Sequence, residues 1–220
     1  MRAISKLISG FRDFRATYFE QHPELYKGFI RKGQRPKILL VACSDSRVDP
    51  AILFNTEPGE LFVVRNVANL VPPYQPDGNY HGTSAAAEFA VRDLEVEEIV
   101  VLGHSQCGGI HALCENMRGR PVDREFITPW ISIALKACAQ DGQHPSGEKN
   151  DDNHQAEQAA IVQSIDNLRT FPWIRDREQA GRIALHGWWF DMEQGTLWGL
   201  DHDRREFCRV EPIVKGKDAP

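Results

Sequence analysis

The chain has 220 residues, 41% of them hydrophobic and 26% charged, with a formal net charge of −5 at pH 7, as expected of a soluble globular protein with a substantial core. It has no basic patch of the kind that binds nucleic acid or anionic lipid, and no apolar run approaches the ~20 residues that span a membrane. Because residues 1–10 lack the apolar core of a signal peptide, we expect a cytoplasmic protein.

Two helices and two strands are predicted in the first third of the chain. Aromatic and aliphatic residues recur at helical spacing over residues 5–21, and a shorter helix follows at 24–31. Apolar runs predict strands at 37–42 and 61–64, with a helical turn at 50–53 between them. The aromatic stripe of the first helix is of a kind that packs on its own domain or on a partner subunit.

The rest of the chain alternates between helical and strand patterns. A loop rich in proline and glycine over 71–78 precedes a helix at 81–94, whose expected inward positions include Ala85, Phe89 and Leu94. The remaining predicted segments are, in order, a strand at 98–102, helices at 107–117 and 125–140, a polar loop at 141–153, a helix at 155–170, and strands at 182–191 and 195–201.

The order of these segments predicts an α/β fold. Strands that alternate with helices form βαβ units, and therefore a mainly parallel sheet with helices on both faces. The last two strands form a hairpin, which adds one antiparallel strand at an edge. A length of 220 residues fits one domain over 1–220, with an N-terminal helical arm at about 1–33.

Two segments that follow strands carry a candidate metal site. Cys43 comes after the apolar run at 38–41, and His104 and Cys107 come after the run at 99–102. The carboxyl ends of adjacent parallel strands meet, so these three side chains are predicted to lie together. Two thiolates and an imidazole suit zinc, and three protein ligands leave a fourth position open for water. The alternative is that the thiols are simply buried and His104 is a loop residue.

The other cysteines have no predicted chemistry. Five cysteines at irregular spacings do not form a disulfide framework. Cys114, Cys138 and Cys208 are therefore expected to be small buried residues.

Residues around the candidate site carry a family resemblance. The first segment reads Cys43-Ser-Asp45-Ser-Arg47, and the second reads His104-Ser-Gln-Cys107-Gly-Gly. Together they resemble the signature of the β-class carbonic anhydrases. Residues 62–69 and the His-Gly-Trp-Trp-Phe-Asp segment that begins at residue 186 are also similar to that family.

The resemblance implies a zinc enzyme, a carbonic anhydrase (carbonate dehydratase, a carbon–oxygen lyase), that reversibly hydrates carbon dioxide to bicarbonate and a proton. It implies one zinc ion per chain, held by Cys43, His104 and Cys107, whose bound hydroxide attacks the substrate. Asp45, paired with Arg47, is expected to orient that nucleophile. The family also implies four parallel strands with a further antiparallel strand, and a homodimer or a higher even homo-oligomer.

Within the family, the chain looks most like the plant-like subgroup. Gln34 and Phe62 match positions at which that subgroup has a glutamine that binds a substrate oxygen and a phenylalanine that lines the pocket. Phe89 stands where a tyrosine is frequent, and Gly108, at a helix start, is a further candidate substrate contact. Leu40 stands where the bicarbonate-inhibited subgroup has a tryptophan, which argues against that form of inhibition.

Three alternative functions differ in how well they fit. A relative on the same scaffold that hydrolyses carbon disulfide or carbonyl sulfide would differ in pocket access, which stays open. A zinc-containing binding or regulatory protein would have a fourth protein ligand or lack the Asp45–Arg47 pair, so it is disfavoured. A nucleotide-binding domain is set aside because no glycine-rich phosphate loop follows a strand.

Overall fold

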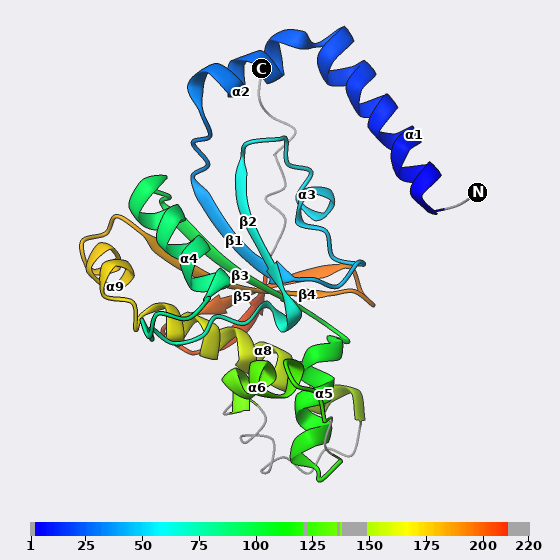
Figure 1. The fold of residues 1–220 in the computed structure, drawn as a ribbon. Helices are drawn as coiled ribbons and strands as arrows, with labels where there is room; N and C mark the ends of the chain where they lie inside the picture. Colours follow the sequence, from blue (N-terminus) through cyan, green and yellow to red (C-terminus); the bar gives the residue numbers. More distant parts are fainter. Residues whose placement is uncertain (1–2, 121–122, 136, 138–148, 211–220) are drawn as a thin grey trace, which may run out of the picture.

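A six-stranded sheet forms the centre of the molecule in the computed structural model, which describes residues 3–120, 123–135, 137 and 149–210 (Figure 1). The strand order is β2-β1-β3-β4-β5-β6; the first four strands run parallel, and β5 and β6 are antiparallel to their neighbours. The α/β fold predicted from the sequence is therefore confirmed. The strands are β1 (Ile38–Cys43), β2 (Leu61–Asn66), β3 (Glu98–His104), β4 (Ala184–Asp191), β5 (Thr196–Asp201) and β6 (Glu206–Arg209).

The helices largely follow the predicted segments. They are α1 (Ala3–Arg15), the π-helical turn η1 (Ala16–Gln21), α2 (Pro23–Lys32), α3 (Pro50–Leu53), the 3₁₀ turn η2 (Val67–Asn69), α4 (Gly82–Glu88), the π-helical turn η3 (Phe89–Asp93), α5 (Gly108–Met117), α6 (Ile127–Ile131), the 3₁₀ turn η4 (Ser132–Ala134), α8 (Lys149–Leu168) and α9 (Pro172–Gln179). None of the described helices is both long and apolar enough to cross a membrane.

The structure differs from the sequence prediction at one helix boundary and in two additional elements. Helix α8 begins at Lys149, inside the predicted loop, and the remainder of that loop lies outside the described residues, as does Cys138. Helix α9 was not predicted, because Pro172 was interpreted only as the residue that ends the preceding helix. Pro172 is in fact the first residue of α9, where a helix has no partner for a backbone N–H and proline is well tolerated. Strand β6 was not predicted either; its Cys208 is exposed, so the prediction that this thiol is buried is wrong.

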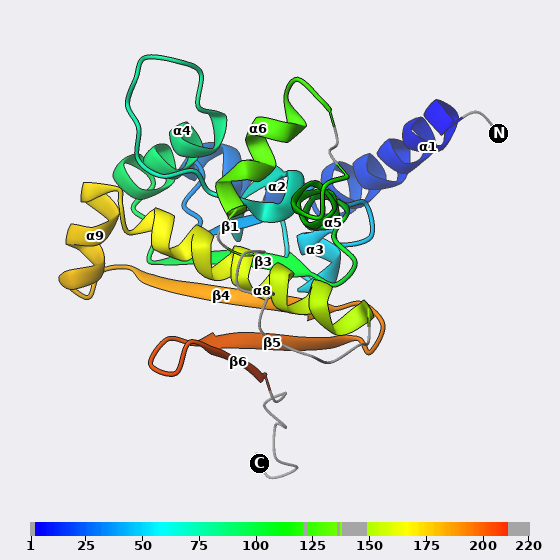
Figure 2. The ribbon, with the colours of Figure 1, turned by 90° about the horizontal axis from the view of Figure 1, so that it is seen from below.

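Helices cover one face of the sheet. Side chains from α8, α9 and the α4–η3 segment pack on this face, and Figure 2 shows α8 lying along β4. The apolar cluster on this face includes Leu39, Val41 and Val101 from the strands and Ile161 and Ile165 from α8. On the opposite face, Leu40 and Val100 belong to a smaller cluster that α3 partly covers.

The inward face of the α4–η3 segment differs from the prediction. Ala90 and Val91 are buried, whereas Ala85 is exposed and Phe89 is 43% exposed. Ala87, Ala90 and Val91 are spaced three and four residues apart and form the buried stripe, whereas Ala85 and Phe89, four residues apart, lie together on another face of the helix. The predicted inward orientation of Ala85 and Phe89 is therefore wrong.

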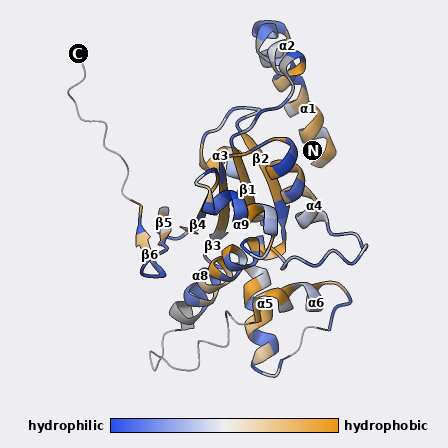
Figure 3. Ribbon diagram, turned by 90° about the vertical axis from the view of Figure 1, so that its left-hand side faces the viewer, coloured by the Kyte–Doolittle hydropathy of each residue, from blue (hydrophilic) through white to orange (hydrophobic). Residues whose placement is uncertain are grey.

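The N-terminal helices stand apart from the sheet (Figure 1). Helix α1 has no buried residue, and its hydrophobic residues Leu7 and Phe11 are 68% and 62% exposed. The orange stretches of the α1 ribbon in Figure 3 mark hydrophobic residues. Phe14, Tyr18 and Tyr26 pack on one another, with the Phe14 and Tyr18 ring centroids 4.9 Å apart. The apolar stripe thus contacts its own short helices, and its packing on a partner subunit stays a prediction.

The sheet positions the ends of β1 and β3 side by side. The two strands are adjacent and parallel, with Ala42 opposite Leu102, so Cys43 and His104 emerge at the same edge. The β-branched and leucine residues that precede them are buried on both faces of the sheet, as is typical of central parallel strands.

Candidate metal centre

Three potential metal ligands meet at this edge of the sheet. Cys43 ends β1, His104 ends β3, and Cys107 is the N-cap residue of α5. The two Sγ atoms are 3.9 Å apart, and one ligand atom from each of the three residues lies within 4.8 Å of the others. All three side chains are buried. The structure therefore brings together the three residues that the sequence grouped.

The imidazole of His104 is oriented with one nitrogen toward this cluster. Its Nδ1 is 2.8 Å from the carbonyl oxygen of Ser105. Because a carbonyl oxygen only accepts, Nδ1 carries the proton and donates it. Nε2 is buried and has no hydrogen-bond partner among the described residues. A buried nitrogen with a free lone pair is costly unless a cation or a donor meets it, which suits a metal ligand.

The two thiols titrate as a pair. A hydrogen bond from the Cys107 thiol lowers the pKa of Cys43 to about 4. The same bond to Cys43 raises the pKa of Cys107 far above its ordinary value. Both groups become thiolates together only when a cation offsets their repulsion. Two thiolates and one imidazole nitrogen are ligands that zinc prefers, so the residues present fit a zinc ion.

Asp45 and Arg47 form a bidentate ion pair beside the cluster. Arg47 Nε donates to Asp45 Oδ1 at 3.0 Å, and Nη2 donates to Oδ2 at 2.7 Å. The Arg47 guanidinium holds the pKa of the Asp45 carboxyl well below its usual range. Arg47 Nη2 also donates to the carbonyl of Gln106, so this side chain joins the loops that follow β1 and β3. Asp45 is engaged with Arg47 and is not among the three clustered ligands.

Arg65 fixes the loop that carries Asp45. Its guanidinium donates to the carbonyl oxygens of Cys43 at 3.0 Å and Asp45 at 2.6 Å, and to Asp49 Oδ2 at 3.0 Å. Asp49 in turn caps α3 by accepting from the Ala51 amide. Arg65 lies within the segment that resembles the family, but its spacing alone does not predict these backbone contacts.

The glycine pair after Cys107 has two different environments. A Cβ on Gly109 would lie 2.8 Å from Val67 Cγ1 and 2.9 Å from Ala68 Cβ, so Gly109 permits close packing of α5 on η2. A Cβ on Gly108 would meet nothing within 4 Å. Of the two glycines, only Gly109 is required by packing, while Gly108 leaves open space at the start of α5.

The sequence interpretation missed Glu157. This carboxylate lies on α8, is only 3% exposed, and accepts from the backbone amide of Cys107 at 2.9 Å and from Trp189 Nε1 at 3.1 Å. Burial raises the pKa of Glu157 to about 7. The available signal is its spacing from Ala160 and Ile161, which places an acidic residue on the apolar stripe of a helix.

The predicted substrate contacts lie away from the cluster within one chain. Gln34 is exposed and precedes β1, whereas Cys43 ends it, so a strand of about 20 Å separates them. Phe62 pairs with Leu39 near the start of β1, and its ring centroid is 5.9 Å from that of Phe89. The two phenylalanines therefore form one apolar group, which a single chain does not bring to the cluster.

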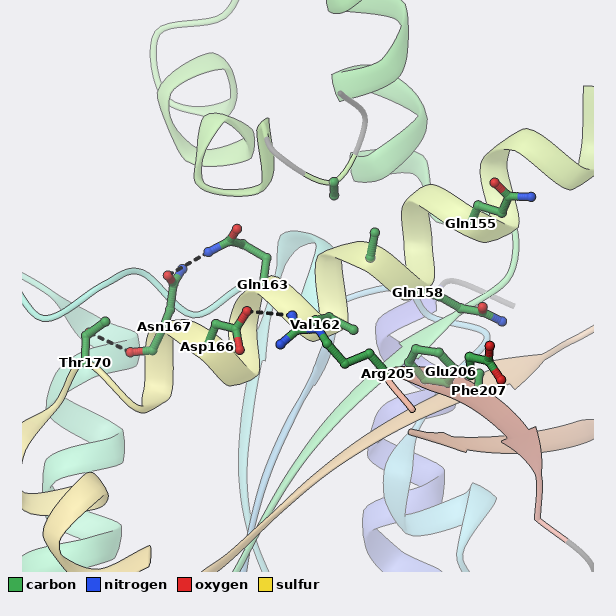
Figure 4. Close-up of a pocket in the computed structure, with 12 residues that line it drawn as sticks. Gln155, Gln158, Val162, Gln163, Asp166, Asn167, Thr170, Arg205, Glu206 and Phe207 are labelled. Carbon is green, nitrogen blue, oxygen red and sulfur yellow. Dashed lines mark hydrogen bonds and ion pairs between the residues drawn. The ribbon is translucent and has the colours of Figure 1, made fainter. Parts of the chain in front are cut away.

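A cavity of about 1020 Å³ lies between α8 and β6 (Figure 4). Arg205 and Asp166 both line it and form an ion pair, with Arg205 Nη2 2.9 Å from Asp166 Oδ2. Amide side chains such as Gln163 and Asn167 also line the cavity. No residue of the metal cluster lines this cavity. We therefore give it no part in the site.

Comparisons with known proteins agree with this geometry. A family model described as "Carbonic anhydrase" matches residues 38–197. Beta carbonic anhydrase 3 of Arabidopsis thaliana is 39% identical over 205 residues, covering 90% of this chain and 78% of that protein. The structure of the β-carbonic anhydrase CcaA has a TM-score of 0.84 and 32% identity, covering 96% of this chain and 93% of that one.

A more distant structure shares the fold. It is one of two structures of tetrameric β-carbonic anhydrases from Sordaria macrospora, with a TM-score of 0.75 and 24% identity. The match covers 96% of this chain and 100% of that one.

Proposed function

The chain belongs to the β-carbonic anhydrase family, and on that premise we propose that it reversibly hydrates carbon dioxide to bicarbonate and a proton at the Cys43–His104–Cys107 cluster. The observation that carries the proposal is the buried Nε2 of His104, which has no hydrogen-bond partner in the described part of the chain and lies beside two thiols whose Sγ atoms are 3.9 Å apart. Cys43, Cys107 and this nitrogen would hold one zinc ion. When bound, zinc supplies a Lewis acid that lowers the pKa of water from ~15.7 to ~7 in the best case.

Asp45 acts as the group that orients the nucleophile. Its carboxylate accepts a hydrogen bond from the attacking oxygen. This bond orients a lone pair of that oxygen toward the substrate carbon. Arg47 keeps Asp45 ionised and fixed in place, because it grips both carboxylate oxygens. Oδ1 already accepts from the backbone amide and from Nε of Arg47, whereas Oδ2 accepts from Nη2 and keeps a second acceptor site, so the ion pair does not prevent this contact.

The substrate pocket is completed by a second copy of the chain. Gln34 and the Phe62–Phe89 pair lie too far from the cluster of their own chain to contact substrate there. In a homo-oligomer, the partner's copies of these side chains would supply an amide donor and an apolar wall, which suits an uncharged substrate. The Sordaria macrospora enzymes, which share this fold, are described as tetrameric. Gly108 leaves room for the substrate at the start of α5.

Asp45→Asn tests the role of the Asp45–Arg47 pair. We expect the variant to bind zinc as the wild type does, because Asp45 is not among the clustered ligands. Its rate of carbon dioxide hydration in stopped flow should fall by about 10²-fold or more. Asp77→Asn, which alters an exposed carboxylate paired with His81, is the control and should keep the wild-type rate. An Asp45→Asn enzyme with the wild-type rate would contradict the orienting role.

A further inference from the structure

The buried carboxylate of Glu157 supports the loop that carries the third ligand. Its Oε1 accepts from the Cys107 amide and its Oε2 from Trp189 Nε1, at 2.9 and 3.1 Å. Both partners are N–H groups, which can only donate, so each carboxylate oxygen has to act as an acceptor. A carboxylate meets this requirement, whereas an amide side chain offers one acceptor and one donor.

The loop itself needs such support. Gln106 has a φ of 58°, in the left-handed region that non-glycine residues rarely occupy. Cys107 then has extended backbone and begins α5 as its N-cap residue, without a side-chain capping hydrogen bond. The contact from Glu157 fixes the Cys107 amide from α8, fifty positions away in the sequence. It therefore anchors the backbone from which the Cys107 thiol projects.

Burying the Glu157 carboxylate costs free energy, and a role in the site would explain why this cost is accepted. Glu157 is 3% exposed, and Ala156, Ala160 and Ile161 around it on α8 are fully buried. An apolar side chain in its place would avoid the desolvation penalty of a carboxylate. A neutral buried side chain on the same helix also anchors a loop: Asn167 Nδ2 donates to the Val71 carbonyl at 2.7 Å.

We propose that Glu157 is a positioning residue that holds Cys107 so that its thiol completes the ligand set with Cys43 and His104. The proposal rests on the proposed zinc site. It assigns Glu157 no contact with the substrate or with the metal. The two hydrogen bonds act together, because the one from Trp189 fixes the carboxylate that receives the one from Cys107.

Metal retention and spectroscopy test this role. We expect Glu157→Gln to bind Zn²⁺ about 10- to 100-fold more weakly in competition with a chelator, as when other supporting partners of metal ligands are removed. In the Co²⁺-substituted protein, the thiolate-to-cobalt absorption band should change in position or intensity. Asn167→Ala removes a buried hydrogen bond from the same helix, and it should lower the melting temperature while leaving Zn²⁺ affinity and the cobalt spectrum unchanged.

A rescue experiment separates the hydrogen-bond geometry from general destabilisation. In Glu157→Gln, the amide –NH₂ faces one of two N–H donors. Changing Trp189 to Phe removes one donor, so the Gln oxygen of the double variant can accept from Cys107 without conflict. The double variant should therefore bind Zn²⁺ more tightly than Glu157→Gln alone.

The outcomes distinguish this proposal from the proposed function. Wild-type Zn²⁺ affinity and cobalt spectrum in Glu157→Gln would overturn the positioning role alone. The role would also be overturned if Asn167→Ala, at the same loss of stability, weakened Zn²⁺ binding and changed the cobalt spectrum as much as Glu157→Gln does. It would likewise be overturned if the double variant bound Zn²⁺ no more tightly than Glu157→Gln. Failure of the reduced wild-type protein to bind Zn²⁺ would contradict the proposed function, and the positioning role with it.

Discussion

Replacing Gly109 by alanine should destabilise the protein, although the change is a single methyl group in a helix. The added Cβ would lie 2.8 Å from Val67 Cγ1 and 2.9 Å from Ala68 Cβ. Neither neighbour moves easily. Ala68 has a φ of 64°, and the Val67 carbonyl accepts from Trp130 Nε1 at 2.7 Å, so relieving the contact requires the η2 backbone or the whole of α5 to shift.

Overpacking of this kind costs about 1–3 kcal/mol. For a chain of this length, that loss corresponds to a melting temperature lower by about 2–12 °C. Gly108 provides the matched control, because its added Cβ would meet nothing within 4 Å and its φ is not in the left-handed region. Alanine is favoured over glycine inside a helix by about 0.5–1 kcal/mol, so Gly108→Ala should be as stable as the wild type or slightly more stable.

Calorimetry or circular dichroism on the zinc-loaded variants, at one protein concentration, measures both effects under comparable conditions. Gly109 packs the start of α5, next to Cys107, so Gly109→Ala should also weaken zinc binding. Gly108→Ala should change the turnover rate and leave zinc binding unchanged. A Gly109→Ala protein as stable as the wild type, or a Gly108→Ala protein that is the less stable of the two, would refute the packing argument.

The remaining predictions concern the metal ligands and the second copy. Cys107→Ser should lose most bound zinc on dialysis, because a hydroxyl is a poor ligand in place of a thiolate; full metal content and activity would remove Cys107 from the site. Gln34→Ala and Cys107→Ser should each have low activity alone. Hybrids formed by co-expressing the two variants should regain part of the activity, because one site then combines the intact metal cluster of one chain with the intact Gln34 of the other. Hybrids no more active than the two variants alone would place Gln34 in the site of its own chain.

The metal cluster was predictable because its signal is local. Apolar runs end directly before Cys43 and His104, and the rule that parallel strands end at one edge then brings the two residues together. Cys107 follows within the same turn. The choice of zinc rests on residue types, which the sequence also contains, and the structure adds the orientation of the His104 ring through Ser105.

The supporting residues were not predictable in the same way. Glu157 contacts Cys107 because of how α8 packs on the sheet, and no local pattern encodes that packing. The predicted strand at 37–42 already separates Gln34 from Cys43, whereas the exposure of Phe89 depends on which face of the α4–η3 segment packs on the sheet. The cytoplasmic location, the oligomeric state and the roles of individual site residues stay predictions.

Carbon dioxide hydration measured by stopped flow from mildly acidic to clearly alkaline pH, with zinc content determined on the same reduced sample, tests the central claim most directly. One zinc ion per chain together with hydration activity is the predicted result, and removal of the zinc should abolish that activity. Reduced protein that hydrates carbon dioxide without zinc, or that holds zinc and shows no hydration at any pH, would contradict the account.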